Sequence, residues 1–370
     1  MIARLTLLLL ALVLPAQAKI ETFYLGTYTA GTSSQGIYAG RLDTDTGKLG
    51  PLHLAAAATP DPTVLALSPD QHVLFAALGN AVASFAIAPD NSLGVINRQP
   101  SSGPNTCYVS LDKTGRQLFS ASYDGGSIAS FPVDARGSIG LPTAIVPLTG
   151  FGPNHMRQAS PHPHSAYVDP ENKHLYVPDL GADKVWTFNL GPHGTLTAAD
   201  PPAIKTESGS GPRHLAFSPD GSQVYVVNEL GVSTCVYSRD PATGALTFLK
   251  SYPNLPGKSP HQTGSAELAI DSAGKHLYVS TRARDFFTVF RINPGADDPL
   301  TVEQVVASPV AFPRSFAIDP SGQWLVVAGE TDDRIGLMKI DPATGHLSAT
   351  PETQPLARPV CVLFLPGLNP

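Results

Sequence analysis

The side chains best able to do chemistry in this sequence recur at matching places in a repeated pattern. The pattern is a short apolar run, a turn and a second apolar run, with polar residues directly before the first run and directly after the second. The polar residues at these places include His164, Arg213, His214, Glu229, Glu267, Arg282 and Arg314. Histidine can take a proton from water near neutral pH, and a guanidinium can stabilise an oxyanion or bind a carboxylate or phosphate at two points. Such a set suits the attack of water on an ester or lactone that carries negative charge.

Within this set a histidine would deprotonate water, and Glu229 would orient either an arginine or that histidine. The residues predicted to bind substrate are His162, His214, Glu267, Arg314 and Asp179. An alternative stays open, in which Arg213–Glu229 and Arg282–Glu267 are structural ion pairs that brace neighbouring repeats. The histidines outside these positions, which we expect to face solvent, are His155, His174, His193, His261 and His276.

Other chemistries receive less support. The sequence contains no Gly-x-Ser-x-Gly motif, and a nucleophilic Cys107 would need a histidine brought to it by the fold. His162 and His164 could share a metal, but no third ligand follows at a familiar spacing, so no metal or other cofactor is expected. Glu229, Glu267 and Glu330 could supply the two carboxylates of a glycosidase, whereas the neighbouring arginines favour an anionic substrate.

The repeats predict the elements that position these residues. Six copies of the pattern begin at residues 66, 110, 167, 216, 269 and 317, which are 44 to 57 residues apart. The runs are short, rich in β-branched and aromatic residues, and bounded by Gly, Pro, Asp and Asn, as β-strands are. A repeat of this length is typical of a four-stranded propeller blade.

A seventh blade is divided between the two ends of the chain. The turn at residues 43–49 lacks an inner strand before it, and the apolar run at residues 360–365 has nothing after it. Joining the two closes an all-β, seven-bladed β-propeller with four-stranded blades, although six or eight blades remain possible if one copy is misread. In a propeller the entry to the first strand and the loop after the second lie on one face. The polar residues should therefore meet at one mouth of the central channel.

Composition and the N-terminus set the context. Residues 1–18 combine Arg4, an apolar run and a small-residue cleavage site, so they are predicted to be a signal peptide. Residues 19–370 should then form one propeller domain, secreted or periplasmic, without a membrane span and monomeric. The net charge is -6 and no basic stretch is present, so no nucleic-acid partner is expected. Three cysteines give no disulfide framework, and Cys107, Cys235 and Cys361 are expected to be buried.

Several ordered motifs resemble the seven-bladed propeller lactonase family, which includes propeller-type 6-phosphogluconolactonases and a fungal carboxy-muconate lactonizing enzyme. The motifs are FYLGTYTAGTSSQGIY (23–38), ASYDGGS (121–127), QASPHPH (158–164), DLGAD (179–183), GPRH (211–214) and NEL (228–230). They span nearly all of the chain after residue 18, and Ser122 stands where the family has asparagine. The resemblance implies that His164, Arg213, Glu229 and Arg282 are catalytic and that the substrate is a small anionic lactone or sugar acid. A non-catalytic propeller that binds a sugar acid, glycan or protein at the same mouth is the alternative.

Overall fold

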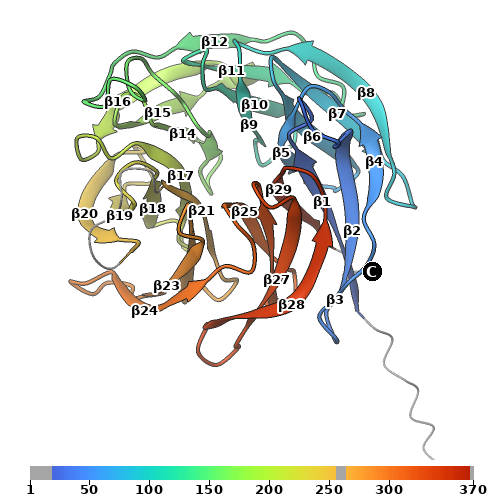
Figure 1. Cartoon of the computed structure of the whole chain (residues 1–370). Helices are drawn as coiled ribbons and strands as arrows, with labels where there is room; N and C mark the ends of the chain where they lie inside the picture. Colours follow the sequence, from blue (N-terminus) through green and yellow to red (C-terminus); the bar gives the residue numbers. More distant parts are fainter. Residues whose placement is uncertain (1–18, 256–263, 367–370) are drawn as a thin grey trace, which may run out of the picture.

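Short antiparallel sheets are arranged around a central channel (Figure 1). The computed structural model describes residues 19–255 and 264–366. In these ranges the strands form seven sheets, and the helical content is one 3-10 turn, η1 (Pro192–Gly194). The prediction of an all-β, seven-bladed propeller is therefore confirmed.

Six blades are built from continuous chain, with the first strand of each next to the channel and the fourth on the outside. In chain order they are β5 (Pro62–Leu67), β6 (Val73–Leu78), β7 (Ala81–Ile87) and β8 (Leu93–Pro100); β9 (Thr106–Leu111), β10 (Gln117–Ser122), β11 (Ser127–Pro132) and β12 (Ala144–Pro147); β13 (Tyr167–Val168), β14 (His174–Asp179), β15 (Lys184–Leu190) and β16 (Leu196–Lys205); β17 (Pro212–Phe217), β18 (Gln223–Asn228), β19 (Ser233–Arg239) and β20 (Leu246–Pro253); β21 (Gly264–Ile270), β22 (His276–Arg282), β23 (Phe286–Ile292) and β24 (Leu300–Ala307); β25 (Pro313–Ile318), β26 (Trp324–Gly329), β27 (Arg334–Ile340) and β28 (Leu347–Pro355).

The seventh blade joins the two ends of the chain, as the sequence predicts. Its inner strand is β29 (Pro359–Leu365), which pairs antiparallel with β1 (Ile20–Thr27) and places Phe364 opposite Phe23. The next strand is β2 (Gly36–Asp43), and both β3 (Lys48–Leu49) and β4 (His53–Ala57) pair with its outer edge. In Figure 1 the red β29 lies directly beside the blue β1. This pairing closes the ring through hydrogen bonds between the chain ends.

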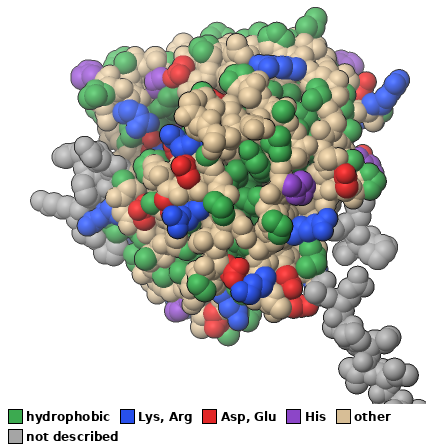
Figure 2. All heavy atoms as spheres, turned by 45° about the vertical axis from the view of Figure 1, so that its right-hand side comes forward, with side chains coloured by type: hydrophobic (Ala, Val, Ile, Leu, Met, Phe, Trp, Pro, Cys, Tyr) green, Lys and Arg blue, Asp and Glu red, His purple; other side chains and the backbone are tan. Residues whose placement is uncertain are grey.

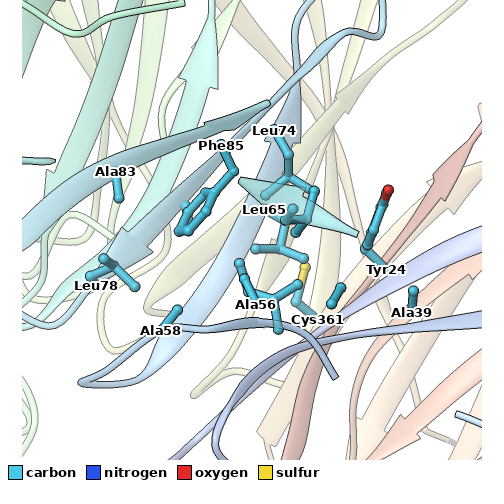
Figure 3. Close-up of a cluster of buried hydrophobic side chains, with 14 of the residues drawn as sticks. Tyr24, Ala39, Ala56, Ala58, Leu65, Leu74, Leu78, Ala83, Phe85 and Cys361 are labelled. Carbon is cyan, nitrogen blue, oxygen red and sulfur yellow. The ribbon is translucent and has the colours of Figure 1, made fainter. Parts of the chain in front are cut away.

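The hydrophobic core is divided among the spaces between blades. Seven buried clusters each join one pair of neighbouring blades. Figure 3 shows the cluster between the divided blade and the next, in which Tyr24, Leu65, Phe85 and Cys361 come from four different strands. A blade is covered on both faces, so its middle strands can be apolar throughout, and all six residues of β6 are buried. The surface is mixed: Figure 2 shows basic and acidic side chains close together on one face.

In several blades the turn between the third and fourth strands packs against the preceding blade. Gly345, with φ of 70°, lies on the His276 ring of that blade, and a Cβ at this glycine would come 2.5 Å from the ring. Gly244, with φ of 73°, lies on His174 in the same way. The expectation that His174 faces solvent is wrong, because the residue is 3% exposed and its Nδ1 lies 2.7 Å from Asp169 Oδ2. His155 and His193 are exposed, as expected, whereas His261 lies outside the described residues.

Candidate functional site

Five of the predicted site residues line a cavity where the inner strands meet, whereas Glu229 and Arg282 are not among its lining residues. The cavity has a volume of about 130 Å³. Five of the seven blades each supply a lining residue from the same place, five positions before the residue that directly follows the inner strand: Thr63, Cys107, His164, Arg213 and Arg314. His214 and Glu267, from the next position, line it too. The propeller geometry thus brings together residues that are far apart in the chain.

His164 is a neutral base at the edge of this cavity. The residue is 6% exposed, and its Nδ1 has no hydrogen-bond partner among the described residues. Burial, with the nearby charges of Arg213 and Arg314 and the ring of His214, holds the pKa of His164 well below its usual range. The imidazole is therefore uncharged at neutral pH and able to accept a proton.

His214 is engaged at both ring nitrogens. Its Nδ1 lies 2.8 Å from Glu267 Oε1, and its Nε2 lies 3.3 Å from Arg213 Nη1. A guanidinium can only donate, so Nε2 accepts from Arg213 and Nδ1–H donates to Glu267. Burial outweighs the attraction of Glu267 and lowers the pKa of His214. Of these two histidines, only His164 has a ring nitrogen without a hydrogen-bond partner among the described residues, because both ring nitrogens of His214 are engaged.

Three guanidinium groups surround the Glu229 carboxylate. Arg157 Nη2 lies 2.7 Å from Oε1, and Arg213 Nε and Arg282 Nη2 lie 3.2 and 3.0 Å from Oε2. Burial by itself would raise the pKa of Glu229, but Arg282, Arg213 and Arg157 together hold that pKa far below the usual range. The carboxylate is therefore charged at neutral pH. Burial, with the charges of Arg314 and Arg282, lowers the pKa of Arg213 to about 10, although Glu229 and Glu267 oppose the shift.

Backbone carbonyl groups hold the side chains of Arg213 and Arg282 in place. Arg213 Nη1 donates to the Ala266 carbonyl, and Arg282 Nε donates to the Gly264 carbonyl at 3.3 Å. Arg282 also lies 5.2 Å from the centre of the Phe312 ring. Of the two ion pairs in the alternative interpretation, Arg213–Glu229 is present, whereas Arg282–Glu267 is not, because Arg282 pairs with Glu229 and His214 pairs with Glu267. These contacts hold the guanidinium planes in place before a ligand arrives.

A second arginine–glutamate group lies nearby. Glu330 contacts Arg314 at 3.6 Å and also pairs with Arg358. Both guanidinium groups lie over the Tyr28 ring, at 5.5 and 5.4 Å from its centre. Arg314 lines the cavity, so this group extends its positive lining toward the divided blade.

Comparison with known proteins agrees with this architecture. Residues 22–364 match the family described as lactonase, seven-bladed β-propeller. The chain belongs to this family. The 6-phosphogluconolactonase of Bacillus subtilis is 33% identical over 347 residues, covering 92% of this chain and 97% of that protein. The one from Xenorhabdus nematophila is 31% identical over 331 residues, covering 87% and 93%. The solved structure of a periplasmic gluconolactonase from Pseudomonas aeruginosa is 29% identical, has a TM-score of 0.87, and covers 94% of this chain and 99% of that one. The predicted lactonase class is confirmed at the level of the family.

Two residues predicted to bind substrate in this lactonase do not line the cavity. His162 stacks on Tyr123 with ring centres 4.3 Å apart, and its Nδ1 lies 2.8 Å from the Tyr123 carbonyl. Asp179 is fully buried and accepts hydrogen bonds from the backbone N–H of His162 and from Trp186 Nε1. Their contacts position the segment that carries His164. Among the described residues no group of three potential metal ligands is present.

The cysteines of this lactonase are buried and unpaired, as expected. Burial raises the pKa of Cys107 to about 12, although Arg213 and Arg314 oppose the shift. Burial also raises the pKa of Cys361 to about 12. Both thiols line the cavity in their protonated form, so a cysteine nucleophile gains no support.

Four residues of the site were not predicted from the sequence: Arg157, Tyr123, Arg358 and Tyr28. Arg157 lies in the connection between β12 and β13, which has no counterpart in the other repeats. Arg358 directly precedes the inner strand β29. In the neighbouring blade the residue directly before the inner strand β25 is Phe312. Neither arginine occupies a repeated polar position, so the pattern carried no signal for them.

Proposed function

We propose that this lactonase hydrolyses a sugar-derived lactone at the cavity, with His164 as general base and His164, Arg213, Glu229 and Arg282 as the catalytic set. The observation that carries the proposal is a neutral, buried histidine with an unengaged Nδ1 beside buried arginines. The family and the names of its relatives, 6-phosphogluconolactonase and gluconolactonase, support the same class of substrate.

The chemistry follows from these groups. Water attacks the lactone carbonyl carbon while His164 removes one of its protons. The carbonyl π electrons move to oxygen, and Arg213 with its neighbouring guanidinium groups stabilises the resulting oxyanion. Collapse re-forms the carbonyl and breaks the ring C–O bond, and the departing ring oxygen receives the proton from His164. The product is an open-chain hydroxy acid, and the net change is the addition of one water molecule.

The remaining polar residues prepare the site. Glu229 holds Arg213 and Arg282 in a fixed orientation, so little reorganisation is needed when charge develops. Glu267 accepts the Nδ1 proton of His214, and Arg213 occupies the other nitrogen. These two contacts fix the tautomer of His214, which lines the cavity with Glu267 and Arg314 and would contact the substrate there. His162 and Asp179 would act indirectly, by supporting the segment that carries His164.

The location of the lactonase belongs to the proposal. We infer that the chain is exported, on the basis of residues 1–18, which lie outside the described residues. The similarity to a periplasmic gluconolactonase agrees with export. The structure contains no membrane-spanning helix in its described ranges. Expression with the native leader in a bacterial host should give a protein outside the cytoplasm that begins near Lys19. A soluble cytoplasmic product that keeps Met1 would contradict export.

The enzymatic proposal is tested by titrating the acid released from plain and phosphorylated aldonolactones. Lactones open spontaneously, so each rate is compared with a protein-free blank. Replacing His164 with Gln removes the proton acceptor and should lower the enzyme-dependent rate by roughly 10²–10⁴-fold. Absence of turnover in the wild type, together with binding of a sugar acid or glycan, would favour the non-catalytic alternative.

A further inference from the structure

We propose that Arg157 is a specificity-determining residue that holds an anionic substituent of the substrate, remote from the lactone carbonyl. The inference rests on the proposed function. It assigns the ligand chemistry, a phosphate or carboxylate carried on the sugar, to one guanidinium at the channel mouth.

Charge around Glu229 gives the first argument. Arg213 and Arg282 already neutralise this carboxylate, and their side chains are 3% and 8% exposed. Arg157 brings a third positive charge to the same group. Three cations around one buried carboxylate repel one another unless a further anion is present. An anionic ligand would complete the balance.

The exposure and hydrogen bonding of Arg157 give the second argument. Its side chain is 43% exposed, so a ligand can reach it from solvent. Nη2 donates to Glu229 Oε1 at 2.7 Å and to the Tyr123 hydroxyl at 3.2 Å. Among the described residues Nε and Nη1 make no hydrogen bond. A guanidinium has five N–H donors, and the free ones can form a two-point contact with a phosphate or carboxylate.

The backbone holds Arg157 in this place. The residue ends an exposed turn at 153–157 that is closed by a hydrogen bond from Gly152 N to Gln158 O of 2.9 Å. Gln158 is fully buried, and its Nε2 donates to Leu180 O at 2.8 Å and to Asp183 Oδ1 at 2.6 Å. A turn anchored by a buried glutamine presents the guanidinium on a fixed base.

Tyr123 sets the distance between the reacting centre and the anion. Its ring lies 5.5 Å from the His164 ring, and its hydroxyl accepts a hydrogen bond from Arg157 Nη2 at 3.2 Å. One side chain therefore contacts both the proposed base and the proposed anion site, which places the two no more than about one aromatic side chain apart. A substituent on the far side of a lactone ring stands at a comparable distance from the carbonyl carbon. This placement fits a lactone whose anionic group is at the end opposite to the ester bond.

The experiment compares two substrates that differ in that group, 6-phosphoglucono-δ-lactone and glucono-δ-lactone. Replacing Arg157 with Gln should lower kcat/KM for the phosphorylated lactone by about 10- to 100-fold, as expected for loss of charge-assisted hydrogen bonds. The neutral lactone should change by less than about 3-fold, because it makes no such contact and because Arg213 and Arg282 still hold the Glu229 carboxylate in the variant. Replacing Arg157 with Lys should recover part of the loss, since Lys keeps the charge without the planar fork. The matched control is Arg291→Gln, which removes an arginine on β23, the third strand of its blade, that is 54% exposed and paired with Glu303.

Three outcomes would overturn the inference: equal losses for both lactones, no loss for either, or a wild type that prefers the neutral lactone. Calorimetry with 6-phosphogluconate separates this inference from the proposed function. A wild type without turnover that binds 6-phosphogluconate, and loses affinity in the Gln variant, keeps the Arg157 site while the hydrolase proposal fails. A wild type that neither turns over the phosphorylated lactone nor binds this acid would overturn the anion site.

Discussion

Arg314 lies 3.6 Å from Glu330, and the two residues occupy the same positions in their blade as Arg213 and Glu229 occupy in theirs. In both blades the arginine follows the proline that begins the inner strand, and the glutamate follows the second strand. The ion pair is therefore a repeated element of the mouth. Glu229 binds two further arginines and Glu330 binds one, so the blades differ in how much positive charge they gather.

The Glu229 group should be important for stability. Replacing Glu229 with Gln leaves Arg213 and Arg282 buried without a counter-charge, which should cost about 3–5 kcal/mol in the free energy of unfolding. Urea denaturation measures this loss. Because the folded pKa of Glu229 is depressed, its contribution is present above pH about 4.5 and is lost as the pH falls below that value. The variant should therefore show a weaker dependence of stability on pH in this acidic range.

A useful comparison is Glu352→Gln, since Glu352 pairs with Lys48 on the surface. Loss of an exposed pair should cost no more than about 1 kcal/mol. Equal effects of the two replacements would contradict a special role for the buried group.

The closure of the ring gives the second prediction. Deleting residues 361–370 removes most of β29 and leaves β1 without its inner partner. Because the deletion also opens two of the buried clusters, cooperative thermal unfolding should be lost. Circular dichroism during heating measures it. Deleting only residues 367–370, beyond β29, should leave the transition intact, and equal behaviour of the two truncations would refute the closure argument.

Interlocking turns give the third prediction, with a control in the neighbouring blade. Gly345 and Gly295 have φ of 70° and 71°, but a Cβ would meet His276 at the first and no atom within 4 Å at the second. Gly295→Ala should cost about 1 kcal/mol for the left-handed backbone alone. Gly345→Ala should cost about 1–3 kcal/mol more, because the His276 ring must move. Chemical denaturation of both variants measures the difference, and equal losses would show that the contact is unimportant.

Much of the fold was predictable because a propeller repeats one local rule. Apolar runs and turn residues recur at the blade period, so the propeller fold and the pairing of the chain ends were predictable, with seven blades favoured over six or eight. The same rule placed His164, Arg213 and Arg314 around one cavity, since equivalent positions of a ring face its axis.

The rest of the site depends on contacts that do not repeat. Arg157 reaches Glu229 from a connection unique to one blade, and no periodic pattern marks such a residue. The partner of Arg282 depends on which carboxylate its guanidinium reaches, and sequence spacing does not decide between Glu229 and Glu267. The packing of His174 and His276 was not predictable from the sequence pattern either. Each histidine pairs with an aspartate of its own blade and is covered by a glycine of the following blade.

The role of His164 predicts a specific pH profile. A general base must be neutral, and burial together with Arg213, His214 and Arg314 lowers its pKa. The neutral form therefore persists below the ordinary histidine pKa of about 6.5. The value of kcat/KM should stay constant as the pH falls from 8 through about 6.5, and its acid limb should appear only at lower pH. Stopped assays with a protein-free blank at each pH measure the limb.

Arg314 provides a variant that moves this limb in a known direction. Arg314→Gln removes a positive charge that opposes protonation of His164, so the pKa should rise and the acid limb should shift toward 6.5. Arg358→Gln is the matched control, because Arg358 pairs with the same Glu330 but is not among the groups that lower the pKa of His164. Each variant will change the absolute rate, but the position of the limb reports the proton on the base. A limb that stays in place in Arg314→Gln, or that persists in His164→Gln, would assign the titration to another group and remove His164 from the mechanism.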